Sequence, residues 1–203
     1  AIMPNIPETI ISMLAVTSLG AVWSSCSPEF GAKSMSDRFS QIKPKMIIST
    51  NGYYFKGKAY NIENKISKVS NLIESVQNTI IVDYLNLDYN QNNSWGRIIK
   101  KSAKSLKFEK FPFDHPIYIL YSSGTTGKPK SIVHSSGGTL IQHLKELRYH
   151  VNLKQDDKIF YYTTCGWMMW NWLVSSLACG STVVLYEGNP FYPNKSSLLK
   201  IMN

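Results

Sequence analysis

Apolar positions along the chain follow either a helical period or short continuous runs. Residues 5–20 carry Ile10, Met13 and Leu14 at helical spacing, with Asn5 as a candidate cap and Pro7 in the first turn, so this stretch is predicted to form a helix. Further helices are predicted at 34–41, 61–74, 138–151 and 167–178. Strands are predicted at 21–24, 46–49, 79–82, 117–121, 131–134, 158–164 and 182–186.

The alternation of these elements indicates the fold class. Strands that are separated by helices usually pair in parallel, because a parallel neighbour needs a long return connection. We therefore expect an α/β fold with mainly parallel sheets and crossover helices. The Asn-rich stretch 86–94 and the basic stretch 100–110 divide the chain into subregions 1–94 and 110–203.

Composition and charge narrow the possible partners. Of the 203 residues, 43% are apolar, and 22 Lys and Arg outnumber 13 Asp and Glu, giving a net charge of +9. No apolar run approaches the roughly 20 residues of a membrane span, so we expect a cytoplasmic protein with no membrane partner. The basic residues are scattered without a nucleic-acid-binding motif. No nucleic-acid partner is expected, and the charge would also attract an anionic small molecule such as a nucleotide or coenzyme A, although charge alone does not decide this.

The residues most informative about chemistry follow the predicted strand 117–121. The stretch Tyr121–Lys130 reads YSSGTTGKPK and combines hydroxyls, two glycines and two lysines. Glycines let backbone N–H groups turn towards an anion, while hydroxyls and ammonium groups add donors and positive charge, so the stretch suits a polyphosphate. It is not a Walker A loop, because Ser122 and Pro129 replace a required Gly and a required Ser or Thr. The alternative is an ordinary Gly/Thr turn.

This stretch resembles the signature loop of the adenylate-forming enzymes, a family that includes acyl-CoA synthetases and luciferases. The segments 27–31 (SPEFG), 37–42 (DRFSQI), 134–143 (HSSGGTLIQH) and 166–172 (GWMMWNW) narrow the resemblance to the acyl-CoA synthetases that activate acetoacetate. The resemblance implies a ligase of ketone-body and lipid metabolism. It would join acetoacetate to AMP, release pyrophosphate and pass the acyl group to CoA, using ATP, Mg²⁺ and CoA.

The resemblance also implies that the chain is part of the large N-terminal adenylation domain. The family's Mg²⁺-holding and ribose-binding segments, and its small C-terminal domain with a catalytic lysine, are not found in these 203 residues. We therefore expect a C-terminal domain of the same chain as a partner and no metal ligand within this segment. We also expect the isolated 203 residues to be inactive.

Roles for the loop follow from the resemblance, residue by residue. The expected phosphate-binding residues are Ser122, Ser123, Gly124, Thr125, Thr126, Gly127 and Lys128. Lys130 and Thr126 are the expected catalytic residues, because their charge and hydroxyl would act on the phosphates during transfer. Ser131 stands where many family members have Gly, so the flexibility of the loop can differ from theirs.

Two further sites are implied by the resemblance. The acyl pocket would be lined by Trp167, Met168 and Met169 at the start of the predicted helix 167–178, whereas Trp170 and Trp172 are assigned to the core. The CoA site would include Ser24, Ser25 and Lys58. The alternatives are ordinary core packing for the Trp and Met side chains and a merely solvated surface lysine.

The remaining candidates are interpreted as structural. The four histidines lack a metal-ligand spacing, and His143 is expected on a solvated helix face. The three cysteines are expected to be reduced, and Cys165 has no neighbouring base that would make it a nucleophile. Two alternative functions stay open, namely an acetyl- or propionyl-CoA synthetase and a non-catalytic nucleotide-binding remnant.

Overall fold

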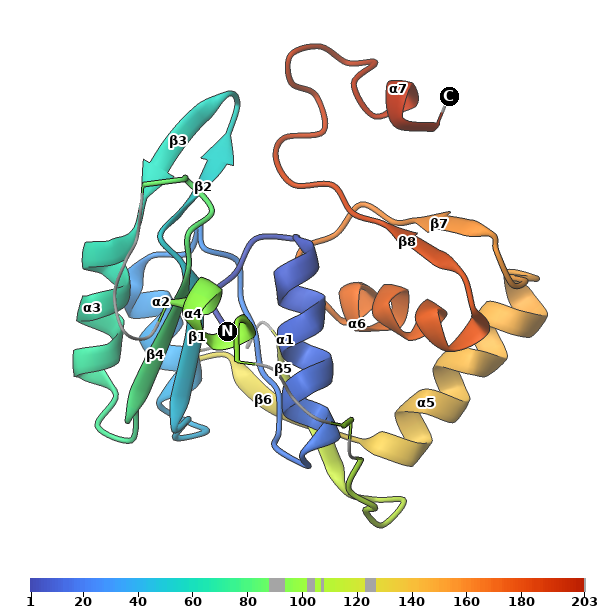
Figure 1. Cartoon of the computed structure of the whole chain (residues 1–203), viewed down its shortest axis with the longest axis horizontal. Helices are drawn as coiled ribbons and strands as arrows, with labels where there is room; N and C mark the ends of the chain where they lie inside the picture. The colour runs from blue at the N-terminus through green and yellow to red at the C-terminus, as the bar shows by residue number, and fades with distance from the viewer. Residues whose placement is uncertain (88–93, 102–104, 107, 123–126, 203) are drawn as a thin grey trace.

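The computed structural model of the protein describes residues 1–87, 94–101, 105–106, 108–122 and 127–202. Its strands are β1 (Met46–Thr50), β2 (Gly52–Phe55), β3 (Lys58–Asn61), β4 (Asn78–Val82), β5 (Pro116–Ser122), β6 (Lys130–Ser135), β7 (Lys158–Phe160) and β8 (Thr182–Val184). Its helices are α1 (Pro7–Ser18), α2 (Ala32–Phe39), α3 (Glu63–Leu72), α4 (Trp95–Ile99), α5 (Ser136–Lys145), α6 (Met168–Ser175) and α7 (Leu199–Met202). In Figure 1, α1 lies between a group formed by α2, α3, β1 and β4 and a group formed by α5 and α6.

The helix α1 lies inside the predicted range 5–20. It begins at Pro7, whose missing N–H is not needed at the first helical position, and the chain turns away at Gly20 with a φ of +76°. The prediction that Asn5 caps this helix is wrong, because Ile6 occupies the cap position. The Asn5 carboxamide instead donates to the Tyr186 carbonyl at 3.2 Å.

The parallel pair β1–β4 is covered by helices on both faces. Its register places Ile47 opposite Thr79, and successive side chains in a strand point to opposite faces. Ile47 and Ile81 accordingly pack with α2 and α3, whereas Ile48 and Val82 pack with α1. Burying each of these aliphatic side chains contributes roughly 1.5–3 kcal/mol. This half therefore has a helix–sheet–helix layering and contains the parallel pairing expected from the sequence.

Isolated β-bridges connect two residues near the N-terminus, which lie outside the named strands, to β1 and to β5. Ile2 forms a parallel bridge with Ser49 in β1, and Trp23 forms one with Tyr118 in β5. Trp23 also exchanges two backbone hydrogen bonds with β5, at 2.9 and 2.8 Å. The predicted strand 21–24 is thus reduced to the bridge at Trp23, which holds the neighbouring Ser24 against the strand that leads into the phosphate loop.

Two of the four strand pairs in the described residues are parallel and two are antiparallel. The α/β class is confirmed, and the parallel pairs are β1–β4 and β7–β8. The hairpin β2–β3 was not predicted; its turn residues Lys56 and Gly57 both have positive φ, +49° and +73°, as a tight two-residue turn requires. The strands β5 and β6, on either side of the phosphate loop, also form an antiparallel hairpin.

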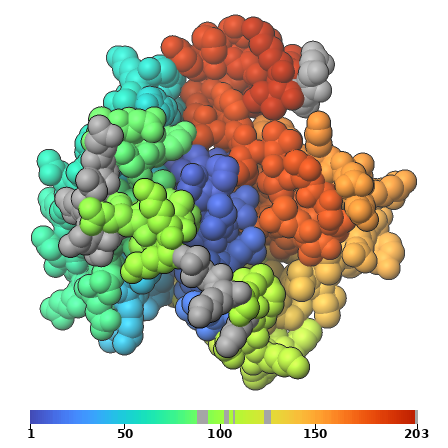
Figure 2. Space-filling view, viewed as in Figure 1, coloured from blue at the N-terminus to red at the C-terminus, as the bar shows by residue number. Residues whose placement is uncertain are grey.

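The second half of the chain packs α5 and α6 beside the pair β7–β8. The helix α5 continues into a π-helical turn at Glu146–His150, and α6 into a 3₁₀ turn at Ser176–Cys179. Leu147, Ile159 and Leu173 form the small core between these elements. The strand β7 ends at Phe160, short of the predicted 164. Figure 2 shows the N-terminal segment, in blue, filling the space between this half and the first.

Candidate functional site

The phosphate loop is the predicted phosphate-binding stretch Tyr121–Lys130. Its two stems, Tyr121–Ser122 at the start and Pro129–Lys130 at the end, are held together by the β5–β6 hairpin. Ser122 ends β5 and is paired with Lys130, which begins β6. Lys128 and Lys130 are exposed, and none of the described residues fills the space beside Gly127 where a side chain would stand. The predicted residues Ser123, Gly124, Thr125 and Thr126 lie outside the described residues. The hairpin thus brings the first and last predicted phosphate-loop residues together, with both lysines accessible to an anion.

The end of α2 and the turn that follows it contact both of these stems. The Tyr121 hydroxyl donates to the Arg38 carbonyl at 3.0 Å, and the Gln41 side-chain amide donates to the Pro129 carbonyl at 2.9 Å. The segment 37–42 was quoted from the sequence only for its resemblance. The structure now places it in direct contact with the loop.

The predicted acyl-pocket residues lie at the N-terminal end of α6. Trp167 occupies the cap position and is 67% exposed, and Met168 is 46% exposed. Met169 is half-buried. Trp167 and Met168 are therefore accessible side chains and not core residues, as the wall of a pocket requires. The assignment of Trp170 and Trp172 to the core is confirmed, because Trp170 is fully buried and Trp172 packs against Leu173 and its neighbours.

One of the two predicted CoA serines, Ser25, contacts the backbone just before α6. The Ser25 hydroxyl donates to the Cys165 carbonyl at 2.6 Å and accepts from the Trp23 indole at 3.0 Å. The Ser24 hydroxyl donates to the Ile119 carbonyl at 2.8 Å. Both serines are buried, so in this structure their hydroxyl protons serve internal hydrogen bonds. Their contact with CoA stays a prediction.

The third predicted CoA residue stands apart from these serines in the fold. Lys58 is exposed and begins β3, just after the turn of the β2–β3 hairpin. Its neighbour Lys56 lies over the Phe55 ring, with 5.7 Å between the ammonium nitrogen and the ring centroid. Both lysines are exposed, and Lys56 in addition lies near an aromatic ring.

Sequence reasoning missed a buried polar junction beneath α6, formed by Asn5, Thr163, Trp170, Tyr186 and Glu187. The Asn5 carboxamide accepts from the Trp170 indole at 2.8 Å and donates to the Tyr186 and Thr163 carbonyls at 3.2 and 3.5 Å. The Asn5 backbone N–H donates to the Glu187 carboxylate at 2.5 Å. Burial raises the pKa of Glu187 to about 7, although this hydrogen bond opposes the rise. The junction ties α6, and with it Trp167, to the N-terminal segment.

The histidines have structural surroundings. The prediction that His143 lies on a solvated face is wrong: it is buried, and its Nδ1 lies 2.8 Å from the Ser175 hydroxyl of α6. Its pKa is lowered by burial and by the charge of His134. His134 stacks at a tilt on Tyr118, with ring centroids 5.0 Å apart, and burial lowers its pKa as well.

The cysteines are free thiols, as predicted. Cys26 and Cys165 are buried, and burial raises the pKa of each thiol to about 12. The Cys165 thiol donates to the Met3 carbonyl at 3.0 Å. A neutral, hydrogen-bonded thiol is a poor nucleophile, which supports the structural interpretation of Cys165.

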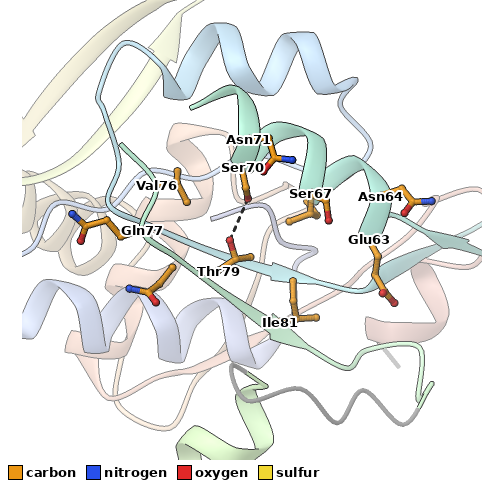
Figure 3. Close-up of a pocket in the computed structure, with 11 residues that line it drawn as sticks. Glu63, Asn64, Ser67, Ser70, Asn71, Val76, Gln77, Thr79 and Ile81 are labelled. Carbon is orange, nitrogen blue, oxygen red and sulfur yellow. Dashed lines mark hydrogen bonds between the residues drawn. The ribbon is translucent and has the colours of Figure 1, made fainter. Parts of the chain in front are cut away.

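Three cavities in the described part of the chain are lined by residues other than the predicted loop and acyl residues. Figure 3 shows a polar cavity of about 460 Å³ between α3 and β4, where Ser70 and Thr79 point towards each other and share a hydrogen bond of 3.2 Å. An apolar cavity of about 580 Å³ lies among α1, α5 and α6. A third cavity of about 510 Å³ includes Ser24 in its wall.

The described ranges contain no group of three or more His, Cys, Asp or Glu side chains that could hold a metal ion. Among the helices of these ranges, none combines the length and the apolar character that a membrane span requires.

Comparison with known proteins identifies the family to which this site belongs. The profile of the AMP-binding enzymes matches residues 1–203. The chain therefore belongs to the AMP-binding enzyme family, whose acyl-CoA synthetases use ATP and CoA. The chain spans about a third of the length of the curated relatives it matches.

Individual relatives narrow the comparison within the family. Acetoacetyl-coenzyme A synthetase of Rhizobium meliloti (strain 1021) is 50% identical over 98% of this chain and 31% of that protein. A malonamoyl-CoA synthetase of Penicillium aethiopicum is 38% identical over 95% of this chain and 28% of that protein. The solved acetoacetyl-CoA synthetase from Streptomyces lividans matches with a TM-score of 0.93 and 39% identity, over 98% of this chain and 31% of that one.

Proposed function

We propose that the protein activates acetoacetate for transfer to CoA. The acetoacetate carboxylate would attack the α-phosphate of ATP to form acetoacetyl-AMP, with pyrophosphate as the leaving group. The CoA thiol would then attack the acyl carbon, and AMP would leave as acetoacetyl-CoA forms. The observation that carries this proposal is the similarity to the Rhizobium meliloti and Streptomyces lividans acetoacetyl-CoA synthetases, at 50% and 39% identity, through nearly the whole chain.

The phosphate loop would serve the first of these steps. The carboxylate and ATP are both anions, so the protein must neutralise charge while it aligns the two reacting atoms. Ser122, Gly127 and Lys128, with Ser123, Gly124, Thr125 and Thr126, would bind the phosphates. Lys130 and Thr126 would act where negative charge builds up on the departing pyrophosphate. The exposure of Lys128 and Lys130 on one hairpin supports these roles.

The acid would be a short 3-oxo carboxylate. Acetoacetate and malonamate have the same heavy-atom shape, because both carry a carbonyl one methylene away from the carboxylate. Two relatives with these substrates in their names therefore point to one shape of pocket. Trp167, Met168 and Met169 would line it, and a polar group that meets the 3-oxo oxygen would give discrimination against acids that lack it.

The remaining requirements follow from the reaction. CoA would be met by Ser24, Ser25 and Lys58, the last through its unpaired charge towards a phosphate group. Mg²⁺ would bind together with ATP. We propose no protein ligand for it among the described residues, which contain no cluster of three or more His, Cys, Asp or Glu side chains. A C-terminal domain of the same chain would complete the active site. We further propose, from the family resemblance alone, a cytoplasmic location and a role in ketone-body and lipid metabolism.

The test is a panel of acids with the protein expressed from its complete gene. AMP formation is measured with ATP, Mg²⁺ and CoA, using acetoacetate, malonamate, 3-hydroxybutyrate, acetate and propionate at equal concentrations. We expect kcat/KM for acetoacetate to exceed that for acetate and 3-hydroxybutyrate by at least about tenfold. A preference for acetate or propionate would assign the protein to those synthetases. Nucleotide binding without AMP formation from any acid would identify a non-catalytic remnant.

A further inference from the structure

We propose that residues 37–41, which form the end of α2 and the turn that follows it, are a platform that fixes both stems of the phosphate loop, with Tyr121 and Gln41 as the positioning residues. This inference rests on the proposed function, because it gives these two side chains a role in holding the loop for ATP. It assigns a purpose to a segment outside the loop, acyl-pocket and CoA residues already named.

The entering stem is fixed by Tyr121. Its hydroxyl donates to the Arg38 carbonyl at 3.0 Å, and its ring meets the Phe39 ring edge-on, with centroids 6.4 Å apart. Burial raises the pKa of Tyr121 to about 12, so the hydroxyl keeps its proton and remains a donor at neutral pH. The next residue along the chain is Ser122, the first predicted phosphate ligand.

The leaving stem is fixed by Gln41. Its side-chain amide donates to the Pro129 carbonyl at 2.9 Å and to the Asp37 carbonyl at 2.8 Å. Both amide hydrogens are thus used, one on the loop and one on the platform itself. Pro129 stands between Lys128 and Lys130, so the bond from Gln41 acts on the backbone that carries both lysines.

The end of a helix is suited to this task. The last carbonyls of a helix lack partners inside it and form its negative pole. In α2 the carbonyls of Asp37 and Arg38 receive the Gln41 amide and the Tyr121 hydroxyl. The platform therefore offers backbone acceptors at the end of α2 to the Gln41 amide and to the Tyr121 hydroxyl.

The geometric consequence is control over where the loop lysines stand. The β5–β6 hairpin fixes the separation of the two stems, since Ser122 and Lys130 are paired. It does not by itself fix the direction of the loop relative to the rest of the domain. Contacts from residues 37–41 to both stems restrict that freedom, and small displacements of charged groups at a reaction centre cost large factors in rate.

The experiment compares three variants of the protein expressed from its complete gene. Gln41→Met keeps the length of the side chain without the amide, and Tyr121→Phe keeps the ring without the hydroxyl. Gln142→Met is the matched control, because Gln142 on α5 makes an exposed side-chain hydrogen bond to Glu146 at 3.1 Å. The Kd of ATP is measured by calorimetry without any acid, followed by KM for ATP and for acetoacetate. Melting temperatures verify folding.

We expect Gln41→Met and Tyr121→Phe each to weaken ATP binding about fivefold, the factor that one hydrogen bond contributes. KM for acetoacetate should stay within twofold, and Gln142→Met should match the unmodified protein throughout. A purely structural role would instead lower the melting temperature and change both KM values together. ATP affinities equal to that of Gln142→Met in both variants would overturn the proposal. The calorimetric comparison stands even if no acid is activated, so failure of the proposed function is seen separately.

Discussion

Glu187 is expected to make the stability of the protein depend on pH. Its carboxylate accepts the Asn5 backbone N–H in the buried junction beneath α6, and burial raises its pKa from 4.5 to about 7. The nearby Glu29 charge raises the pKa further. The folded protein thus holds a proton that the unfolded chain releases.

The sign and size follow from this difference. Between the unfolded and folded pKa values the native state binds more protons, so stability is fully present below pH 4.5 and is lost as pH rises through about 7. A pKa difference of about 2.5 corresponds to about 3 kcal/mol, of which about 2.5 kcal/mol falls between pH 5 and pH 8. Glu187→Gln keeps an acceptor for the Asn5 N–H but does not titrate.

The assay is urea unfolding of the protein and of Glu187→Gln at pH 5, 6, 7 and 8. The variant should gain about 2–3 kcal/mol relative to the unmodified protein over this range, from near equality at pH 5. The titratable groups that both proteins share contribute equally to the two free energies of unfolding and therefore cancel in their difference. A difference that stays constant with pH would refute the reasoning, because the carboxyl would then titrate at the same pH in the folded and unfolded states.

Three further outcomes are expected. Asn5→Ala should destabilise the protein by about 2–3 kcal/mol, because it leaves the buried Trp170 indole N–H without an acceptor; urea unfolding measures this, and a loss no larger than that of the exposed Asn64→Ala would contradict it. A thiol reagent at pH 8 should label Cys179 in the native state and the two buried cysteines only after unfolding, as peptide mass spectrometry would show. Lys130→Ala should slow single-turnover formation of acyl-AMP at least about tenfold with little change in acetoacetate affinity; an unchanged rate in rapid-quench measurements would remove the assigned role.

Local signals predicted α1, α2, α3, α5 and α6, whereas the short helix α4 was not predicted. Pro7 marks the start of α1, and Gly20 marks the turn after its end. The spacing of apolar residues predicted a helix at 61–74, and α3 lies inside this range. The β2–β3 hairpin was missed because its strands are mostly exposed and its Lys56–Gly57 turn differs from the usual Asn-Gly or Asp-Gly. The antiparallel pairing of β5 and β6 had a usable signal, since the connection between them is too short for a crossover.

Long-range partners could not be predicted from local pattern. His143 stands among charged residues of its own helix, yet it is buried because Ser175 of α6 packs against it. The Asn5 carboxamide suited a helix cap, but the Trp170 indole lies 165 positions away in sequence and uses it instead. The contacts of Gln41 and Tyr121 with α2 and the loop likewise span more than 80 positions. The chemistry of the loop was visible in its residues, whereas its support was not.

The most direct test of the proposed function is isotope exchange between labelled pyrophosphate and ATP. The protein expressed from its complete gene is incubated with ATP, Mg²⁺ and acetoacetate in the absence of CoA. Formation of acetoacetyl-AMP is reversible in this mixture, so label should appear in ATP only when acetoacetate is present, and a large excess of acetate should not replace it. Exchange without any acid, or none with acetoacetate, would contradict the assignment of this chain to acetoacetate activation.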